Sequence, residues 1–308
     1  MAAAALGDGD KIEMVNLPLM SSRLPALADG AVDVLVHEVT HTMERDVLES
    51  NTNVSFAFSA PYLYSGMKVA GLPFFVQECI EKNFQHIEEC SELKVCVNAG
   101  GTHQRALKEL IPERFIVPIE FLFSVHEFID MFENGVCNTF AGTPYSMSEQ
   151  MVRENGYDGE YAITERYFSK EPLSMVTKGD DPVFSDLVNS VLQALLVAEQ
   201  HNIMQDTALT FPITDVFGDE YQDIFRNAIA FAGNFGEIYD RYLGEFMPRD
   251  TLNSINSGSS GLIFSHPLGL IVTERDGKPL GPRMQAILDR GILRCGVRPN
   301  NRLGFAAT

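Results

Sequence analysis

The middle of the chain alternates strands with helices, and two extended segments bracket this block. Residues 92–142 are predicted to form strand, helix, strand, helix and strand in turn. Such alternation predicts an α/β fold with mainly parallel sheets. Extended segments at residues 60–70 and 168–177 carry the chain into the block and out again. Two crossings of this kind indicate two lobes joined by a hinge, with a ligand bound in the cleft at the carboxyl ends of strands.

The rest of the chain supplies elements for the other lobe. Residues 31–36 are a β-branched run bounded by a glycine, which predicts a buried strand. Residues 73–87 have helical spacing. The clearest helix covers residues 181–203, with Asp181 as its cap and Pro182 in its first turn.

The charge balance excludes one broad class of partner. The 308 residues include 23 Lys and Arg against 42 Asp and Glu, a formal net charge of −19. Neutralising phosphates requires clustered basic residues, so no nucleic-acid partner is expected. No apolar run approaches the roughly 18 residues of a transmembrane helix, and the first residues lack the basic region of a secretory signal. These features do not identify the cellular compartment of the protein.

Two of the five cysteines lie where a disulfide is geometrically reasonable. Cys96 and Cys137 fall in two strands expected to be neighbours. A disulfide in an oxidising compartment and two buried free thiols are both consistent with the sequence. The spacing of the five cysteines is not that of a zinc ribbon or a disulfide-rich scaffold.

The stretch around residue 40 supports two interpretations. His37, Glu38 and His41 spell H-E-x-x-H, which on a helix places two imidazoles on one face to hold Zn²⁺, with the glutamate as general base. The surrounding β-branched residues and the lack of an N-cap instead predict a strand running into a turn. We therefore expect a chance match to the zinc peptidase motif and no metal.

Two further features are suited to bind an anion. Gly100 and Thr102 lie in a turn between a predicted strand and helix, where backbone N–H groups and a hydroxyl bind carboxylate or phosphate. The turn lacks the glycine patterns of nucleotide-binding loops, so no cofactor is expected. Arg45 either clamps a carboxylate through two hydrogen bonds or pairs at the surface with Glu44 or Asp46.

Short motifs in a fixed order connect the chain to a known family. The chain resembles the family 3 solute-binding proteins of ABC transporters, and more closely the general L-amino-acid-binding type. The motifs run from about residue 11 to about residue 264 and read LADGAVDVL, T-x-T-x-x-R, FSAPYLYSG, KVCVNAGGT, FENGVCNTF, SKEPLSMVTKGDDPVFSDLVNSVLQALLVAEQ, GNFGEIYDRYLG and SINSGSSGLIF.

The resemblance implies a fold and a division of the chain. The fold is the type II periplasmic-binding-protein-like fold, with two parallel-rich α/β sheets flanked by helices that close on a ligand around a two-strand hinge. Residues 1–70 would begin lobe one, residues 71–173 would form lobe two, and residues 174–308 would return to lobe one. The same resemblance implies an extracytoplasmic or periplasmic location, although this chain shows no signal peptide.

The resemblance also implies residue roles. Arg45 would clamp the α-carboxylate of an amino-acid-like ligand, with Thr40 and Thr102 donating hydrogen bonds to it. Glu38 would line the same pocket. Thr143 stands where relatives usually carry the acid that pairs with the ligand ammonium.

Three departures from the family bear on this expectation. Thr143 is neutral, and position 298, where relatives may carry a pocket acid, is Arg298. Residues 291–306 resemble the first strand of the family domain but stand at the far end of the chain, and the first residues resemble the end of its first helix. These departures predict a module cut out of register, either a permuted domain or a window from tandem modules, and we expect residues 292–297 to lie beside residues 32–36.

The sequence therefore predicts a binding protein, and not an enzyme, for a small carboxylate-bearing solute. A membrane transporter or receptor is the expected partner, in transport or sensing. The alternatives are a dehydratase-like enzyme with Glu38 as the acid, a binder of an anionic or altered ligand, and a degenerate module that binds nothing.

Overall fold

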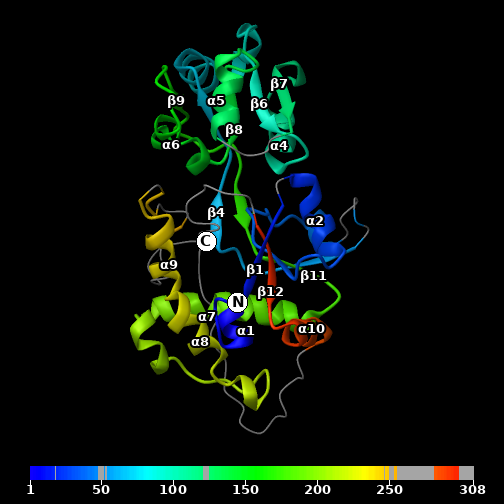
Figure 1. The fold of residues 1–308 in the computed structure, drawn as a ribbon. Helices are drawn as coiled ribbons and strands as arrows, with labels where there is room; N and C mark the ends of the chain where they lie inside the picture. The colour runs from blue at the N-terminus through cyan, green and yellow to red at the C-terminus, as the bar shows by residue number, and fades with distance from the viewer. Residues whose placement is uncertain are drawn as a thin grey trace.

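The computed structural model describes residues 1–17, 19–47, 52, 54–120, 125–245, 247–249, 253–254 and 281–297. These residues form two lobes, each built on a five-stranded sheet, with a two-stranded sheet between them (Figure 1). Arg298 and most of the SINSGSSGLIF motif lie outside the described residues. No helix in the described part of the chain is long and apolar enough to cross a membrane.

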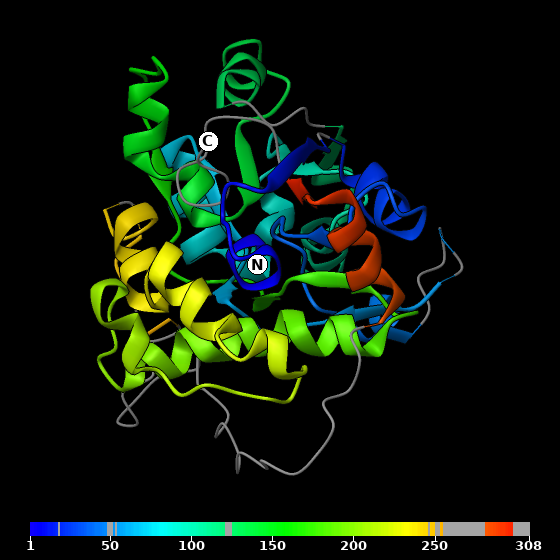
Figure 2. The same cartoon turned by 60° about the horizontal axis from the view of Figure 1, so that its bottom comes forward.

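The sheet of lobe one contains the last strand of the described chain at an inner position. Its order is β1-β12-β2-β11-β3, and the strands are β1 (Ile12–Asn16), β2 (Val34–Leu35), β3 (Phe56–Phe58), β11 (Val176–Lys178) and β12 (Leu293–Val297). Strand β12 runs parallel to both neighbours, with Cys295 opposite Val34 and Gly296 opposite Leu35. The prediction that residues 292–297 lie beside residues 32–36 is confirmed, and Figure 2 shows the blue and red ends of the described chain side by side in this lobe.

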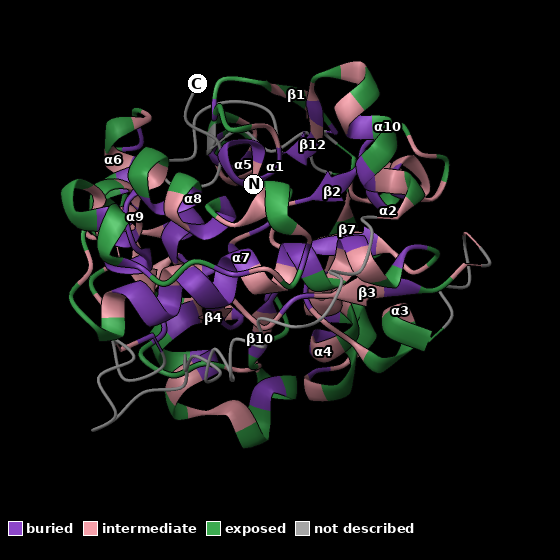
Figure 3. Ribbon diagram, turned by 90° about the horizontal axis from the view of Figure 1, so that it is seen from below, coloured by how far each residue is buried: buried purple, intermediate pink, exposed green. Residues whose placement is uncertain are grey.

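Helices cover this sheet and bury its core. They are α1 (Ala2–Leu6), α2 (Met20–Ala28), α3 (Met43–Val47), α7 (Pro182–Gln200), α8 (Ile224–Ala232), α9 (Phe235–Tyr242) and α10 (Pro282–Arg290), with 3-10 turns at Gln205–Thr210 and Asp219–Tyr221. The start of α7 is as predicted, because Pro182 opens the helix and the Asp181 side chain accepts a hydrogen bond from the Phe184 N–H at 3.0 Å. Figure 3 shows buried residues along α7, where Phe184 and Leu187 are almost fully enclosed.

Lobe two has the same mixed construction. Its sheet has the order β7-β6-β8-β5-β9, from β5 (Lys68–Gly71), β6 (Val95–Asn98), β7 (Ile116–Ile119), β8 (Thr139–Gly142) and β9 (Ala162–Ile163). Its helices are α4 (Thr102–Leu110), α5 (Val125–Glu133) and α6 (Glu149–Glu154), with short turns η3 (Glu113–Phe115) and η4 (Pro144–Met147). The predicted helix over residues 73–87 is instead a π-helix, Phe74–Lys82, and a 3-10 helix, Phe84–Glu89, separated at Asn83.

Half of the strand pairs in each five-stranded sheet are antiparallel, although the sequence predicts mainly parallel pairing. Strands β1, β12 and β2 are parallel in lobe one, as are β7, β6 and β8 in lobe two. Strands β11, β3, β5 and β9 pair in the antiparallel sense. The difference arises because a chain that leaves a lobe and returns to it through a hinge runs in opposite directions on its two passages.

The predicted hinge is confirmed. Strands β4 (Leu63–Ser65) and β10 (Glu171–Leu173) pair antiparallel, with Glu171 opposite Ser65 and Leu173 opposite Leu63. On the other edge of β10, the Pro172 carbonyl accepts a hydrogen bond from the His41 N–H at 2.9 Å. An isolated bridge from Leu173 to Thr40 attaches the hinge to lobe one.

Two disulfides lie in lobe two. Cys96 in β6 is bonded to Cys137, so the disulfide alternative holds and the free-thiol alternative does not. A second disulfide, Cys79–Cys90, joins the two helical turns before β6 and was not predicted. Cys295 is a buried free cysteine.

Candidate functional site

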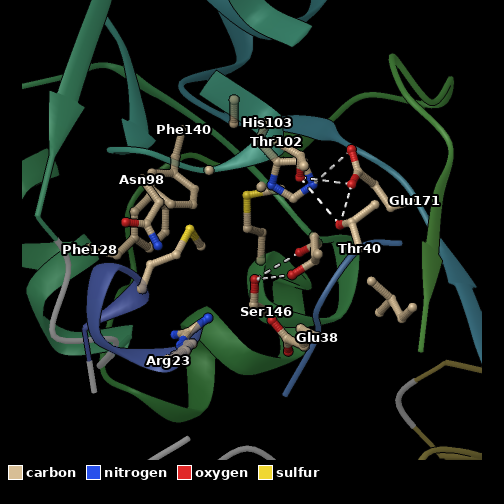
Figure 4. Close-up of a pocket in the computed structure, with 17 residues that line it drawn as sticks. Arg23, Glu38, Thr40, Asn98, Thr102, His103, Phe128, Phe140, Ser146 and Glu171 are labelled. Carbon is tan, nitrogen blue, oxygen red and sulfur yellow. Dashed lines mark hydrogen bonds and ion pairs between the residues drawn. The ribbon is translucent and has the colours of Figure 1, made fainter. Parts of the chain in front are cut away.

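A cavity of about 70 Å³ lies between the lobes at the carboxyl ends of β2, β6 and β8 (Figure 4). A second cavity, of about 40 Å³, shares residues with it beside α2 and α3. Their polar lining comes from both lobes and the hinge: Arg23, Glu38, Thr40, Arg45, Asn98, Thr102, His103, Thr143, Ser146 and Glu171. This is where a ligand is expected in a fold of this class.

The turn after β2 brings Glu38 and Thr40 to the cavities. Residues 37–41 are not helical, so the H-E-x-x-H sequence does not place its two imidazoles on one helix face. His37 is buried, whereas His41 stacks on the ring of Phe58 at 4.3 Å. Glu38 has a φ of 41°, a conformation that costs energy for a residue other than glycine and is concentrated at functional sites. Across the described residues, no group of three or more His, Cys, Asp and Glu side chains is placed to hold a metal.

A hinge carboxylate joins the two lobes at this site. Glu171 of β10 is 4% exposed, and its Oε2 accepts hydrogen bonds from Thr40 of lobe one at 2.6 Å and from Thr102 of lobe two at 2.8 Å. Its Oε1 accepts a third from Ser169 at 2.8 Å. Glu171 was not among the predicted site residues, although it is the only acid in the predicted crossing at residues 168–177.

Burial and neighbouring groups set the ionisation of this cluster. Burial by itself raises the pKa of Glu171, but the nearby His103 and the three hydroxyl donors lower it by more, so the net pKa lies below its ordinary value. Burial lowers the pKa of His103, which the carboxylates of Glu171 and Glu38 only partly offset. The arrangement therefore favours a charged Glu171 beside a neutral imidazole at neutral pH.

Acid is expected to destabilise the protein through these two groups. The unfolded chain takes up a proton on His103 below its ordinary pKa of 6.5 and on Glu171 below 4.5, at pH values where the folded protein does not. The free energy of unfolding then falls as the pH drops through these values. Thermal unfolding between pH 7.5 and 5 should show a shallower fall for His103→Gln than for wild type. The exposed His86 provides the control, because His86→Gln should leave the slope unchanged; equal slopes for all three proteins would contradict the assignment.

Two arginines reach the site. Arg45 of α3 lines only the smaller cavity, and its Nη1 donates to the Thr40 carbonyl at 2.8 Å. Arg23 of α2 is 4% exposed and lines both cavities. Arg23 was missed because it lies within an apolar helix face, next to the buried Leu24. A charged residue among buried apolar neighbours is the signal that would have found it.

The remaining predicted residues divide between the cavity and its surroundings. Thr102 and Thr143 line the larger cavity, but Gly100 does not: it is exposed and donates its N–H to the Gln104 side chain at 2.9 Å. Gly101 takes its place in the lining. Across the cavity from Glu171, Figure 4 shows the aromatic rings of Phe128 and Phe140. The cavity thus combines charged, hydroxyl and aromatic walls.

Three relatives found by comparison with known proteins are all named as binding proteins. The chain is 26% identical over 288 residues to the glutamate/glutamine/aspartate/asparagine-binding protein BztA of Rhodobacter capsulatus, covering 87% of this chain and 80% of that protein. It is 26% identical over 289 residues to the general L-amino acid-binding periplasmic protein AapJ of Rhizobium johnstonii, with the same coverage. A periplasmic binding protein from Brucella ovis, solved with glutathione bound, has a TM-score of 0.68 at 22% identity, covering 86% of each chain. No protein-family model matches the chain.

Proposed function

We propose that this protein binds a small carboxylate-bearing solute, similar to an amino acid, in the cleft between its lobes. Its sequence is related to those of periplasmic amino-acid-binding proteins of ABC transporters, and it has the two-lobed fold of periplasmic binding proteins. The observation that supports this most directly is the pair of adjoining cavities beside the hinge: Arg23, Glu38 and Glu171 line the larger one, and Arg23, Arg45 and Glu38 line the smaller one. An amino acid carries one charge of each sign at neutral pH. A site with groups of both signs is complementary to it.

The size of the cavity favours a small solute. The cavity of about 70 Å³ is only about twice the roughly 30 Å³ that one water molecule occupies in the liquid. The lobes already touch across it, since the Thr40 and Thr102 hydroxyls lie 3.3 Å apart and Arg105 of α4 pairs with Glu44 of α3 at 2.8 Å. A solute of amino-acid size fits this closed arrangement better than a peptide does.

Arg45 is the proposed anchor for the ligand carboxylate, and its removal tests the proposal. Calorimetry with a panel of amino acids and dicarboxylates should detect binding to wild type. Arg45→Ala should weaken that binding by about 10- to 100-fold, because hydrogen bonds to charged groups are worth about 1.5–3 kcal/mol. Arg114→Ala, which removes an exposed arginine paired with Glu88 in lobe two, should bind as wild type does. No heat with any member of the panel would reject the proposal.

The cellular setting follows from the same proposal. We place the protein outside the cytoplasm, as a binding component for a membrane transporter or receptor. The periplasmic relatives support this, as do the two disulfides, because disulfides persist mainly in oxidising compartments. A dehydratase-like enzyme with Glu38 as the acid is the rival. Product formation during the same titrations, abolished in Glu38→Gln, would favour the rival.

A further inference from the structure

The ammonium of an amino-acid ligand needs a negative partner in a site this enclosed, because an unpaired buried charge is strongly unfavourable. Thr143 and Ser146 cannot supply it: their hydroxyls lie 3.0 Å apart, bonded to each other, and carry no charge. The described lining of the larger cavity contains two carboxylates, those of Glu38 and Glu171. The two differ in their surroundings.

Glu38 already has positive neighbours. It shares the smaller cavity with the guanidinium groups of both Arg23 and Arg45, and it is only partly buried. Solvent reaches Glu38, so a charge pair formed there with a ligand ammonium would be screened more than one formed at the buried Glu171.

Glu171 is placed differently. Within the described part of the chain, the only basic group within 4 Å of its carboxylate is His103, with Nε2 at 3.9 Å from Oε1. Its hydrogen-bond donors are the neutral hydroxyls of Thr40, Thr102 and Ser169. Burial also lowers the pKa of His103, so the imidazole supplies little positive charge at neutral pH.

One acceptor position on this carboxylate remains. An ionised carboxylate offers about four lone-pair positions, two on each oxygen. Oε2 accepts from Thr40 and Thr102, while Oε1 accepts only from Ser169. Glu171 lines the cavity, and the position left on Oε1 is the one that a ligand donor would use.

We propose that Glu171 is the specificity-determining residue for an α-ammonium group, pairing with it from the hinge strand. This inference rests on the proposed function and names the residue that would hold the ammonium group of its amino-acid-like ligand. Because Glu171 also binds a hydroxyl from each lobe, the ammonium joins a contact that spans the closed cleft.

The test compares ligands that differ only by the ammonium. Calorimetry would use L-glutamate with glutarate and L-alanine with propionate, on wild type, Glu171→Gln and Glu171→Asp. Wild type should prefer the ammonium-bearing member of a pair by about 10- to 100-fold, the range expected for a hydrogen bond to a charged group. Glu171→Gln should lose most of that preference, and Glu171→Asp should retain part of it. The preference is a ratio, so a general weakening of both ligands by the substitution cancels.

Controls distinguish ammonium recognition by Glu171 from the proposed binding of a carboxylate-bearing solute. Glu13→Gln removes an exposed carboxylate of β1 far from the cleft and should keep the wild-type preference. If wild type binds both members of a pair equally, or if Glu171→Gln keeps the preference, the inference is rejected and carboxylate binding stands. Loss of the preference in Glu38→Gln with Glu171→Gln unaffected would also reject it. Absence of binding to wild type by every probe would reject the proposed function itself.

Discussion

Asp33→Ala is expected to lower the free energy of unfolding by about 3–5 kcal/mol, the usual effect of removing one member of a buried ion pair. Asp33 is 2% exposed and follows the turn into β2. Its carboxylate accepts hydrogen bonds from the Arg290 guanidinium and from the Arg294 N–H, the latter at 2.8 Å, and lies 4.0 Å from Arg283. One carboxylate thus ties α10 and β12 to the sheet of lobe one.

A second ion pair in the same region gives the matched control. Glu13 of β1 pairs with Arg294 of β12 at 3.0 Å, and both side chains are exposed. Glu13→Ala should cost no more than about 1 kcal/mol, because exposed pairs contribute little. Denaturant unfolding of wild type and both variants would measure the difference. Equal losses for Asp33→Ala and Glu13→Ala would show that Asp33 does not hold the segment.

Loss of the Cys96–Cys137 disulfide is expected to have a comparable effect. The bond joins residues separated by 41 positions, and the chain-entropy relation assigns a loop of that size about 4 kcal/mol. The double variant Cys96→Ala/Cys137→Ala should lose about this much stability. The Cys79–Cys90 bond spans 11 positions, so its double variant should lose less, about 3 kcal/mol. Denaturant unfolding of the three proteins would rank them, and a larger loss for the shorter loop would contradict the entropic explanation.

The pairing itself is checked by counting thiols. Cys295 is buried and free, and burial raises its pKa to about 12, so alkylation of the native protein should modify no cysteine. Alkylation after unfolding without reductant should modify one, and after reduction all five. Modification of more than one cysteine without reductant would show that a disulfide is absent.

Local chemistry made much of the fold predictable. The α7 helix was evident because Asp181 and Pro182 mark its start and apolar residues repeat along it. The hinge followed from the two extended segments around the middle block. The split at Asn83 and the antiparallel halves of the sheets were not predictable in the same way, because they depend on tertiary connections rather than on the periodicity of a segment.

The sequence pointed to lining residues in both lobes and missed the acidic one at the hinge. Thr102 stood out because a hydroxyl at a glycine turn is suited to bind an anion, whereas Thr40 was implied by the family resemblance; both line the cavity. Their partner in the structure is Glu171, which is 131 residues from Thr40 in the chain. Nothing in the sequence around Glu171 indicates that two hydroxyls from different lobes converge on it. Arg23 was missed for a related reason, since its helix also looks structural from its pattern alone.

The inner position of β12 has a consequence for how the protein is made. Glu13 and Arg294, neighbours in the sheet, are 281 residues apart in the chain, so at about 5–20 residues per second the ribosome needs roughly 15 to 55 seconds between them. Strand β1 has β12 as its only sheet neighbour among the described strands, and Asp33 precedes its partners Arg290 and Arg294 by 257 and 261 residues. All five strands of the lobe-two sheet precede β12 in the chain, so the sheet of lobe one is the later of the two to have all its strands.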